Sequence, residues 1–208
     1  MKKMKRILSA AMVLLLMMTL PINAFAAEWY MEDGDITVNA GSSGQTVTQG
    51  TNVDVPDAAP VITQKDSSTA TTNTVTINAE SGATAEVTLD GVNINTSGMG
   101  KAAVSTTGDG DVNIELDNEN TIKSANDHAG LEKKNTGELT ITDSNGVDGS
   151  LDATGGNSGA GIGGGDFKDG SNITITGGDV TAQGGESAAG IGAGRSGKCS
   201  NITIWGDA

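Results

Sequence analysis

The sequence predicts an all-β fold, a right-handed parallel β-helix (a solenoid) of about five to six coils of 25–34 residues with an irregular N-terminal cap. The first observation is repetition: residues 150–178 and 179–207 are identical at 15 of 29 positions without a gap. The second is composition, because the chain has 31 Gly among 208 residues and only 2% aromatic residues. Its core must therefore use short runs of Val, Ile and Leu, as solenoid repeats do.

Residues 1–26 have the pattern of a secretory signal peptide. Four basic residues lie between Lys2 and Arg6, an apolar run follows over Ile7–Leu20, and Ala24-Phe25-Ala26 fits a cleavage site. The apolar run is short for a membrane-spanning helix, which needs about 20 residues. We therefore expect a secreted or cell-surface protein with no membrane segment after cleavage.

The charge of the remaining chain argues against nucleic acid as a partner. Residues 27–208 carry eight basic and 26 acidic residues, a net charge of −18. Such a chain is repelled by nucleic acid and by anionic membranes. Cys199 is the single cysteine, so no internal disulfide forms, and the single histidine, His128, is distant in sequence. Neither residue is expected to be catalytic.

Residues 27–72 lack the repeat and are expected to form an N-terminal cap and loop. Asp35–Asn39 alternates like a strand, Gln45–Val55 is a second strand candidate, and Pro56–Thr74 has the composition of a long loop. Trp29 and Tyr30 are candidates to cover the end of the core, because a solenoid must protect its terminal strands from edge-to-edge pairing. A frayed terminus is the alternative.

Residues 73–208 are expected to form the parallel β-helix, with an incomplete last coil. Stacking equal coils places Ile173 beside Ile202 and Ile162 beside Ile191, in parallel strands about 4.8 Å apart. The crossovers should be right-handed, as parallel connections usually are. Equivalent strands are expected to begin at Val87, Val112, Leu139, Ile173 and Ile202, at spacings of 25 to 34 residues.

These repeats resemble a known group of bacterial surface proteins. The segment GSNITITGGDVTAQGG (residues 170–185), followed by Ala188–Gly194, resembles Gly-rich repeats of secreted Gram-positive proteins. Upstream, Val87–Ile94 and Glu115–Ser124, followed by Ala129-Gly130-Leu131, occur in the order used by proteins called carbohydrate-binding-domain-containing. The resemblance covers roughly residues 73–208. It implies a calcium-holding parallel β-helix similar in fold to pectate lyases.

Acidic turns are the candidate calcium ligands. Calcium prefers six to eight oxygen ligands from carboxylates and carbonyls. The candidates are Asp109 and Asp111, in an Asp-Gly-Asp turn, and Asp117 and Glu119, after a predicted strand. None of these segments matches an EF-hand loop, and a solvated turn remains the alternative for each pair.

Four residues are candidate contacts for a sugar ligand. Phe167 lies in the polar loop Asp166–Asp169, and Trp205 follows the last strand. Aromatic rings of this kind are platforms for sugars when exposed, although the Phe167 ring has the alternative of folding over the edge of its coil. Asn172 and Asn201 occupy equivalent repeat positions and would offer repeated amide groups.

Catalysis is not expected, although two enzyme classes remain as alternatives. A polysaccharide lyase needs a cationic base beside its calcium carboxylates. Arg195, the single arginine after residue 26, replaces Asp166 of the preceding repeat, which indicates a surface position. A glycoside hydrolase would need a carboxylate pair, for which Asp90 with Asp117, or Asp109 with Asp111, are the candidates.

These observations lead to one expected function and two alternatives. We expect a secreted or cell-surface solenoid that binds extracellular polysaccharide (a pectin-like, host or wall glycan) without catalysis, with calcium as a candidate cofactor. The first alternative is a structural stalk segment of a larger adhesin. The second is a polysaccharide lyase or hydrolase.

Overall fold

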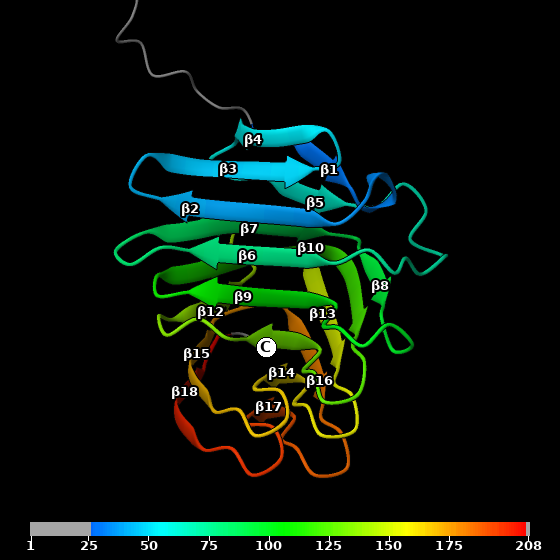
Figure 1. Cartoon of the computed structure of the whole chain (residues 1–208), viewed down its shortest axis with the longest axis vertical. Coiled ribbons are helices and arrows are strands. Elements are labelled where there is room, and N and C mark those ends of the chain that lie inside the picture. Colours follow the sequence, from blue (N-terminus) through cyan, green and yellow to red (C-terminus); the bar gives the residue numbers. More distant parts are fainter. Residues whose placement is uncertain (1–25, 207–208) are drawn as a thin grey trace, which may run out of the picture.

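The computed structural model of this protein describes residues 26–206. The expected signal peptide, residues 1–26, lies outside this range except for its last residue. No helix between residues 26 and 206 has the length and apolar character needed to cross a membrane. The strands there form a parallel β-solenoid of about six coils, stacked along the long axis of the molecule (Figure 1).

One sheet runs the whole length of the solenoid. Its strands, in spatial order, are β1 (Glu28–Tyr30), β5 (Val61–Thr63), β7 (Thr84–Asp90), β10 (Asp111–Lys123), β12 (Leu139–Thr142), β15 (Gly170–Ile175) and β18 (Cys199–Ile204). Every neighbouring pair in this order is parallel. The second half of β10 turns away to pair with shorter strands, which are β8 (Asn93–Asn95) and β13 (Gly149–Thr154), with β16 (Asp179–Gln183) beyond β13.

A second sheet contains the remaining strands. In spatial order they are β17 (Ile191–Gly192), β14 (Ile162–Gly163), β11 (Leu131–Lys133), β9 (Val104–Gly108), β6 (Val75–Ala79), β2 (Ile36–Gly41), β3 (Gly44–Gln49) and β4 (Asn52–Pro56). Strands β9, β6, β2 and β3 lie one above another in Figure 1. Two neighbouring pairs in this order, β2 with β3 and β3 with β4, are antiparallel, and the other pairs are parallel.

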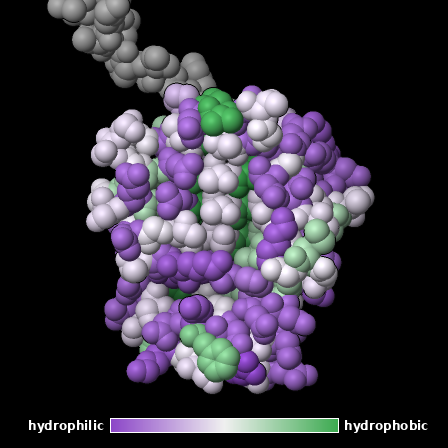
Figure 2. All heavy atoms as spheres, viewed as in Figure 1, coloured by the Kyte–Doolittle hydropathy of each residue, from purple (hydrophilic) through white to green (hydrophobic). Residues whose placement is uncertain are grey.

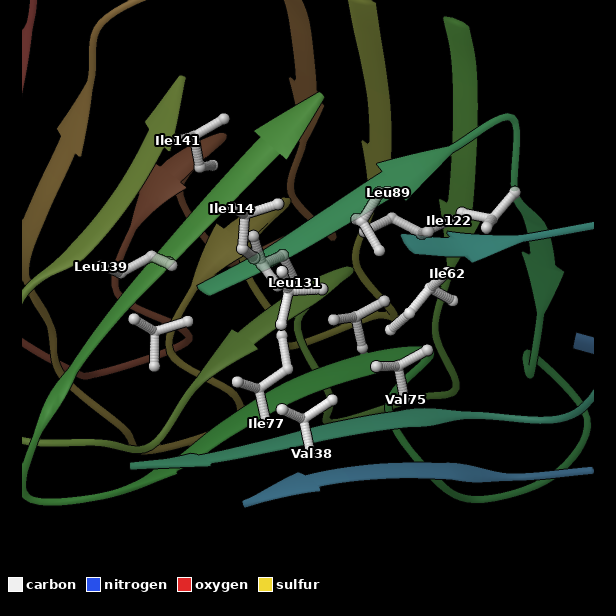
Figure 3. Close-up of a cluster of buried hydrophobic side chains, with 14 of the residues drawn as sticks. Val38, Ile62, Val75, Ile77, Leu89, Ile114, Ile122, Leu131, Leu139 and Ile141 are labelled. Carbon is white, nitrogen blue, oxygen red and sulfur yellow. The ribbon is translucent and has the colours of Figure 1, made fainter. Parts of the chain in front are cut away.

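The predicted repeat register is confirmed. Ile173 pairs with Ile202 and Ile162 with Ile191. Because side chains alternate between the two faces of a strand, equal register places every inward residue above another inward residue. Figure 3 shows the resulting aliphatic side chains pointing toward one another between the sheets, among them Ile77, Ile114 and Leu131.

The N-terminal segment differs from its expected form in two places. Pro56–Thr74, expected as a loop, contains β5, and Gln45–Val55, expected as one strand, is divided between β3 and β4 by a turn at Gly50. Strands β3, β4 and β5 are short and lie outside the repeat. The alternation of apolar residues alone therefore did not locate their ends. Trp29 is buried as expected, and its indole N–H donates to Asp57 Oδ2 at 2.8 Å.

Asparagines make the bends of the coils. Asn118 within β10, Asn172 within β15 and Asn201 within β18 have φ of 56°, 57° and 52°. This left-handed region is unfavourable for most L-residues and is tolerated by Asn. Asn118 separates the part of β10 in the long sheet from the part that pairs with β13. The bends at Asn172 and Asn201 carry outward side chains to a polar surface.

Candidate functional site

A groove of about 470 Å³ lies between equivalent loops of two neighbouring coils. Its walls are Lys133–Thr136 from one coil and Lys168, Asp169, Ser171 and Asn172 from the next. The two loops correspond because Leu139 and Ile173, which follow them, are paired residues of β12 and β15. Three lysines therefore line one groove in a strongly acidic chain.

Lys133 is buried in the wall of this groove, where its side chain bonds to the backbone. Its position on β11 pairs with the inward residue Thr106, and it is 6% exposed. Its ammonium group donates to the backbone oxygens of Asn135 at 2.8 Å and Gly137 at 2.7 Å. Burial lowers the pKa of Lys133. These bonds fix the shape of the loop that forms one wall.

Lys134 and Lys168 are the exposed cations of the groove. The Lys134 ammonium lies 3.3 Å from Glu132 Oε1, and Glu132 Oε2 is 2.5 Å from His128 Nδ1. Among residues 26–206, no carboxylate lies within 4.0 Å of the Lys168 ammonium. Lys168 thus retains its full capacity to pair with an anionic ligand.

A second groove of about 360 Å³ adjoins the first, because Asn172 lines both. Asn201, one of the predicted contacts, lies in it together with Thr174 and Thr203. The amide of Asn201 donates to Asn172 Oδ1 at 2.9 Å, and that of Asn172 to the backbone oxygen of Thr136 at 3.1 Å. The stacked amides keep unused donor and acceptor capacity.

The Phe167 ring is exposed, as one of the two sequence interpretations expected. It is 64% exposed and immediately precedes Lys168 in the chain. Trp205, the other predicted aromatic contact, is 65% exposed and follows β18, with its backbone N–H donating to Ile175 O at 3.0 Å. Neither Phe167 nor Trp205 lines either groove.

The four predicted calcium ligands lie at two separate places. Asp109 accepts from the Thr136 hydroxyl at 3.0 Å and Asp111 from the Glu138 N–H at 2.8 Å, where β10 begins. Asp117 and Glu119 flank the Asn118 bend, six or more residues farther along β10. Within the described part of the chain, no three His, Cys, Asp or Glu side chains are grouped so as to hold a metal.

Acidic side chains crowd around the Asn118 bend. Glu119 lines a groove of about 780 Å³ together with Asp90, Asp148 and Asp179. The pKa of Asp117 is raised, first by burial and then by the neighbouring carboxylates Asp90, Glu115 and Asp143. The amide of Asn145 donates to Asp117 at 2.7 Å and partly offsets this rise. This face therefore repels anions, in contrast with the lysine groove.

Two features of the surface were missed from sequence. Lys134 lies five residues before Leu139, and Lys168 lies five residues before Ile173, the strand partner of Leu139. The two lysines are therefore equivalent positions, and aligning the repeats would have brought them together. The exchange of Asp166 for Arg195 was interpreted only as a surface position. Arg195 is exposed, but its guanidinium pairs with Asp166 across the coils at 2.6 Å.

Another outward surface is polar and uncharged. Figure 2 shows mainly hydrophilic and weakly hydrophilic residues over β2, β6 and β9. Paired outward side chains form rows there, which are Thr37, Thr76 and Ser105, and Asn39, Asn78 and Thr107. Asn78 donates to Asn39 Oδ1 at 3.4 Å, and Thr107 donates to Asn78 Oδ1 at 3.1 Å. The row of Asn39, Asn78 and Thr107 is therefore linked by hydrogen bonds between its own side chains.

Comparison with family models, with curated proteins and with solved structures finds no match to this chain. Function is therefore inferred from the side chains themselves. The lysine groove and the adjoining Asn groove, called together the lysine–asparagine surface below, combine cationic and amide groups with two carboxylates, Asp169 and Glu138, on one continuous face. The cationic and amide groups recognise carboxylates and hydroxyls by charge and hydrogen bonding.

Proposed function

We propose that this protein is exported and binds an extracellular polysaccharide at the lysine–asparagine surface without changing it chemically. The observation that supports this is the convergence of Lys134 and Lys168 on one groove. The net charge of −18 over residues 27–208 repels a polyanion from the rest of the surface, so binding of an acidic glycan must be confined to that groove. A pectin-like chain, which carries a carboxylate on each sugar, fits that groove better than a neutral glycan does. Export is inferred from the leader sequence.

Each type of side chain has a role in this binding. The ammonium groups of Lys134 and Lys168 pair with sugar carboxylates, and the amides of Asn172 and Asn201 bond to sugar hydroxyls. Exposed ion pairs contribute about 0–1 kcal/mol each. Affinity must therefore come from several sugars bound in a row, so long polymers should bind much more tightly than short oligomers.

Binding isotherms of residues 27–208 on polygalacturonate test the proposal. We expect saturable binding, weakened about five- to tenfold in the double variant Lys134→Ala/Lys168→Ala because two ion pairs are lost. Lys65→Ala removes the same type of charge near Tyr30, away from the groove, and is the control. Equal affinity of wild type and double variant would contradict the assignment of the groove.

The same assay tests calcium and catalysis. We propose calcium as a cofactor held by the acidic turns, so a chelator should weaken binding and added calcium should restore it. Binding that is indifferent to chelator would remove calcium from the proposal and leave the groove in place. Unsaturated products in the binding mixture would instead identify a polysaccharide lyase.

A structural stalk segment is the second candidate. It is favoured by the uncharged rows on β2, β6 and β9, whose Asn39, Asn78 and Thr107 bond to one another instead of facing a groove. Absence of binding to acidic and neutral polysaccharides, with and without calcium, would favour this function over the first.

A further inference from the structure

The backbone at Phe167 has an unusual conformation for an aromatic residue. Its φ is 54°, in the left-handed region, and its side chain is 64% exposed. Bulky residues rarely adopt this conformation, and they keep it only where surrounding contacts impose it. Burial does not explain it, because the ring lies largely in solvent. The contacts that hold the loop are therefore informative about why the ring is presented.

Some of those contacts are backbone bonds, from Asp166 N–H to Asp127 O and from Lys168 N–H to Gly165 O. Others come from Arg195 in the next coil. The N–H of Phe167 donates to the backbone oxygen of Arg195 at 3.0 Å. The guanidinium donates through Nε and Nη2 to both carboxylate oxygens of Asp166, at 2.8 and 2.6 Å. Its Cζ atom also lies 4.6 Å from the centroid of the Phe167 ring. One residue thus binds the loop backbone, the preceding carboxylate and the ring.

The neighbouring coil has the same turn without the ring. Ser196 occupies the position equivalent to Phe167 and has φ of 62°. The turn conformation is therefore a property of the repeat, whereas the aromatic ring and its arginine contact belong to this coil. Because Asp166 and Arg195 are one repeat apart, stacking alone brings the two side chains together.

We propose that Arg195 is a positioning residue that holds Phe167, which precedes the groove residue Lys168 in the chain, as a stacking platform for a sugar ring. The guanidinium covers one face of the ring and leaves the rest of the exposed ring for the apolar face of a sugar. A ring that is already held loses less conformational freedom on binding. The planar, forked guanidinium is required, because the ammonium of lysine neither stacks nor forms two parallel bonds to Asp166. This inference rests on the proposed polysaccharide binding.

Phe167 is suited to direct observation, because it is the only phenylalanine in residues 27–208. Incorporation of 4-fluorophenylalanine gives a single ¹⁹F resonance that reports the surroundings of this ring. We expect polygalacturonate to shift the resonance in the wild type. Arg195→Lys and Arg195→Ala should each move the resonance of the free protein and weaken polygalacturonate binding at least fivefold. Lys198→Ala removes a charge from the same loop and should do neither.

The outcomes separate this inference from the proposed function. If Phe167→Ala and Lys134→Ala/Lys168→Ala weaken binding while Arg195→Lys binds normally, the positioning role is wrong and the proposed function stands. Weaker binding of Arg195→Lys with an unchanged ¹⁹F resonance would also overturn the positioning role. If Lys134→Ala/Lys168→Ala and Phe167→Ala all bind like the wild type, the assignment of binding to the lysine–asparagine surface fails, and absence of binding by the wild type overturns the proposed function itself. Equal melting temperatures of Arg195→Lys and Lys198→Ala would show that the loop variants remain folded.

Discussion

Lys133 occupies an inward position that neighbouring coils fill with uncharged residues, Ile77 and Thr106. A buried ammonium is tolerated there because two backbone oxygens, of Asn135 and Gly137, accept hydrogen bonds from it. The charge fixes a loop conformation, and its removal is destabilising because it leaves the two carbonyls without donors. The position of Lys134 at the groove depends on that loop.

A pH-dependent stability difference follows from the lowered pKa of Lys133. Below the folded-state pKa both states hold the proton, and the cost of burying the charge is fully present. As pH rises from that value toward the unfolded value of about 10.4, the folded state releases its proton first, so stability rises. Relative to Lys133→Met, the wild type should therefore become more stable between neutral pH and pH about 10.

Denaturant unfolding of both proteins at several pH values measures this difference. At neutral pH the variant should be less stable by about 1–3 kcal/mol, because two carbonyls lose their donor. As pH rises, the difference in the free energy of unfolding between the wild type and Lys133→Met should widen by about 1.4 kcal/mol per unit of pKa shift. Other titrating groups are common to both proteins and cancel. A difference that is constant or narrows with rising pH would contradict the assignment.

The pairing of Asp166 with Arg195 could be predicted from sequence only in part. Their separation by one repeat was visible, and stacking of equivalent positions was predicted correctly for Ile173 with Ile202. Opposite charges at equivalent positions therefore implied a contact. Presentation of the Phe167 ring was not predictable, because it depends on the left-handed backbone and on side-chain directions in the next coil.

At the scale of elements, the repeated strands were predictable and the first strands were less so. Aliphatic alternation in equal register specifies β12, β15 and β18, because each inward residue has a counterpart one repeat away. Strands β3 and β4 have no repeat counterpart and pair antiparallel. The grooves likewise combine residues of different coils, so they could be located only after the coils were aligned.

The row of isoleucines through these strands predicts a gradient of mutational cost. Ile141 is fully buried between coils, whereas Ile204, in the same row on β18, is 56% exposed. Ile141→Ala should lower the free energy of unfolding by about 2–5 kcal/mol. Ile204→Ala should lower it by less than about 1 kcal/mol, since most of that side chain already contacts water. Chemical denaturation of both variants measures the two losses in the free energy of unfolding. Equal losses would contradict the observed stacking.

At the scale of the whole molecule, each coil contacts mainly its two neighbours. Stability in such a structure is close to a sum of coil and interface contributions. Strand β10 pairs with strands on both sides, while β18 has a parallel partner only in β15 among the residues described. Opening should therefore begin at β18 rather than at β10.

Native-state hydrogen exchange measures this order. Amides of β18 and β16 should exchange fastest among the strands, and amides of β7, β10 and β12 slowest, with opening free energies that approach the global value. Strands β1 and β2 should be better protected than β18, because Trp29 and the β3–β4 pair cover that end. Uniform protection along the solenoid would mean that it unfolds as a single cooperative unit.

The constant register of stacked partners in the last two coils has a genetic consequence. Leu151 faces Val180, Ile162 faces Ile191 and Ile173 faces Ile202, always one repeat apart. A tandem duplication of one repeat in the gene would insert a further layer, about 4.8 Å thick, without requiring new complementary surfaces. The number of repeats in the gene then sets the length of the molecule. Each added repeat also brings one more asparagine at the position of Asn172 and Asn201.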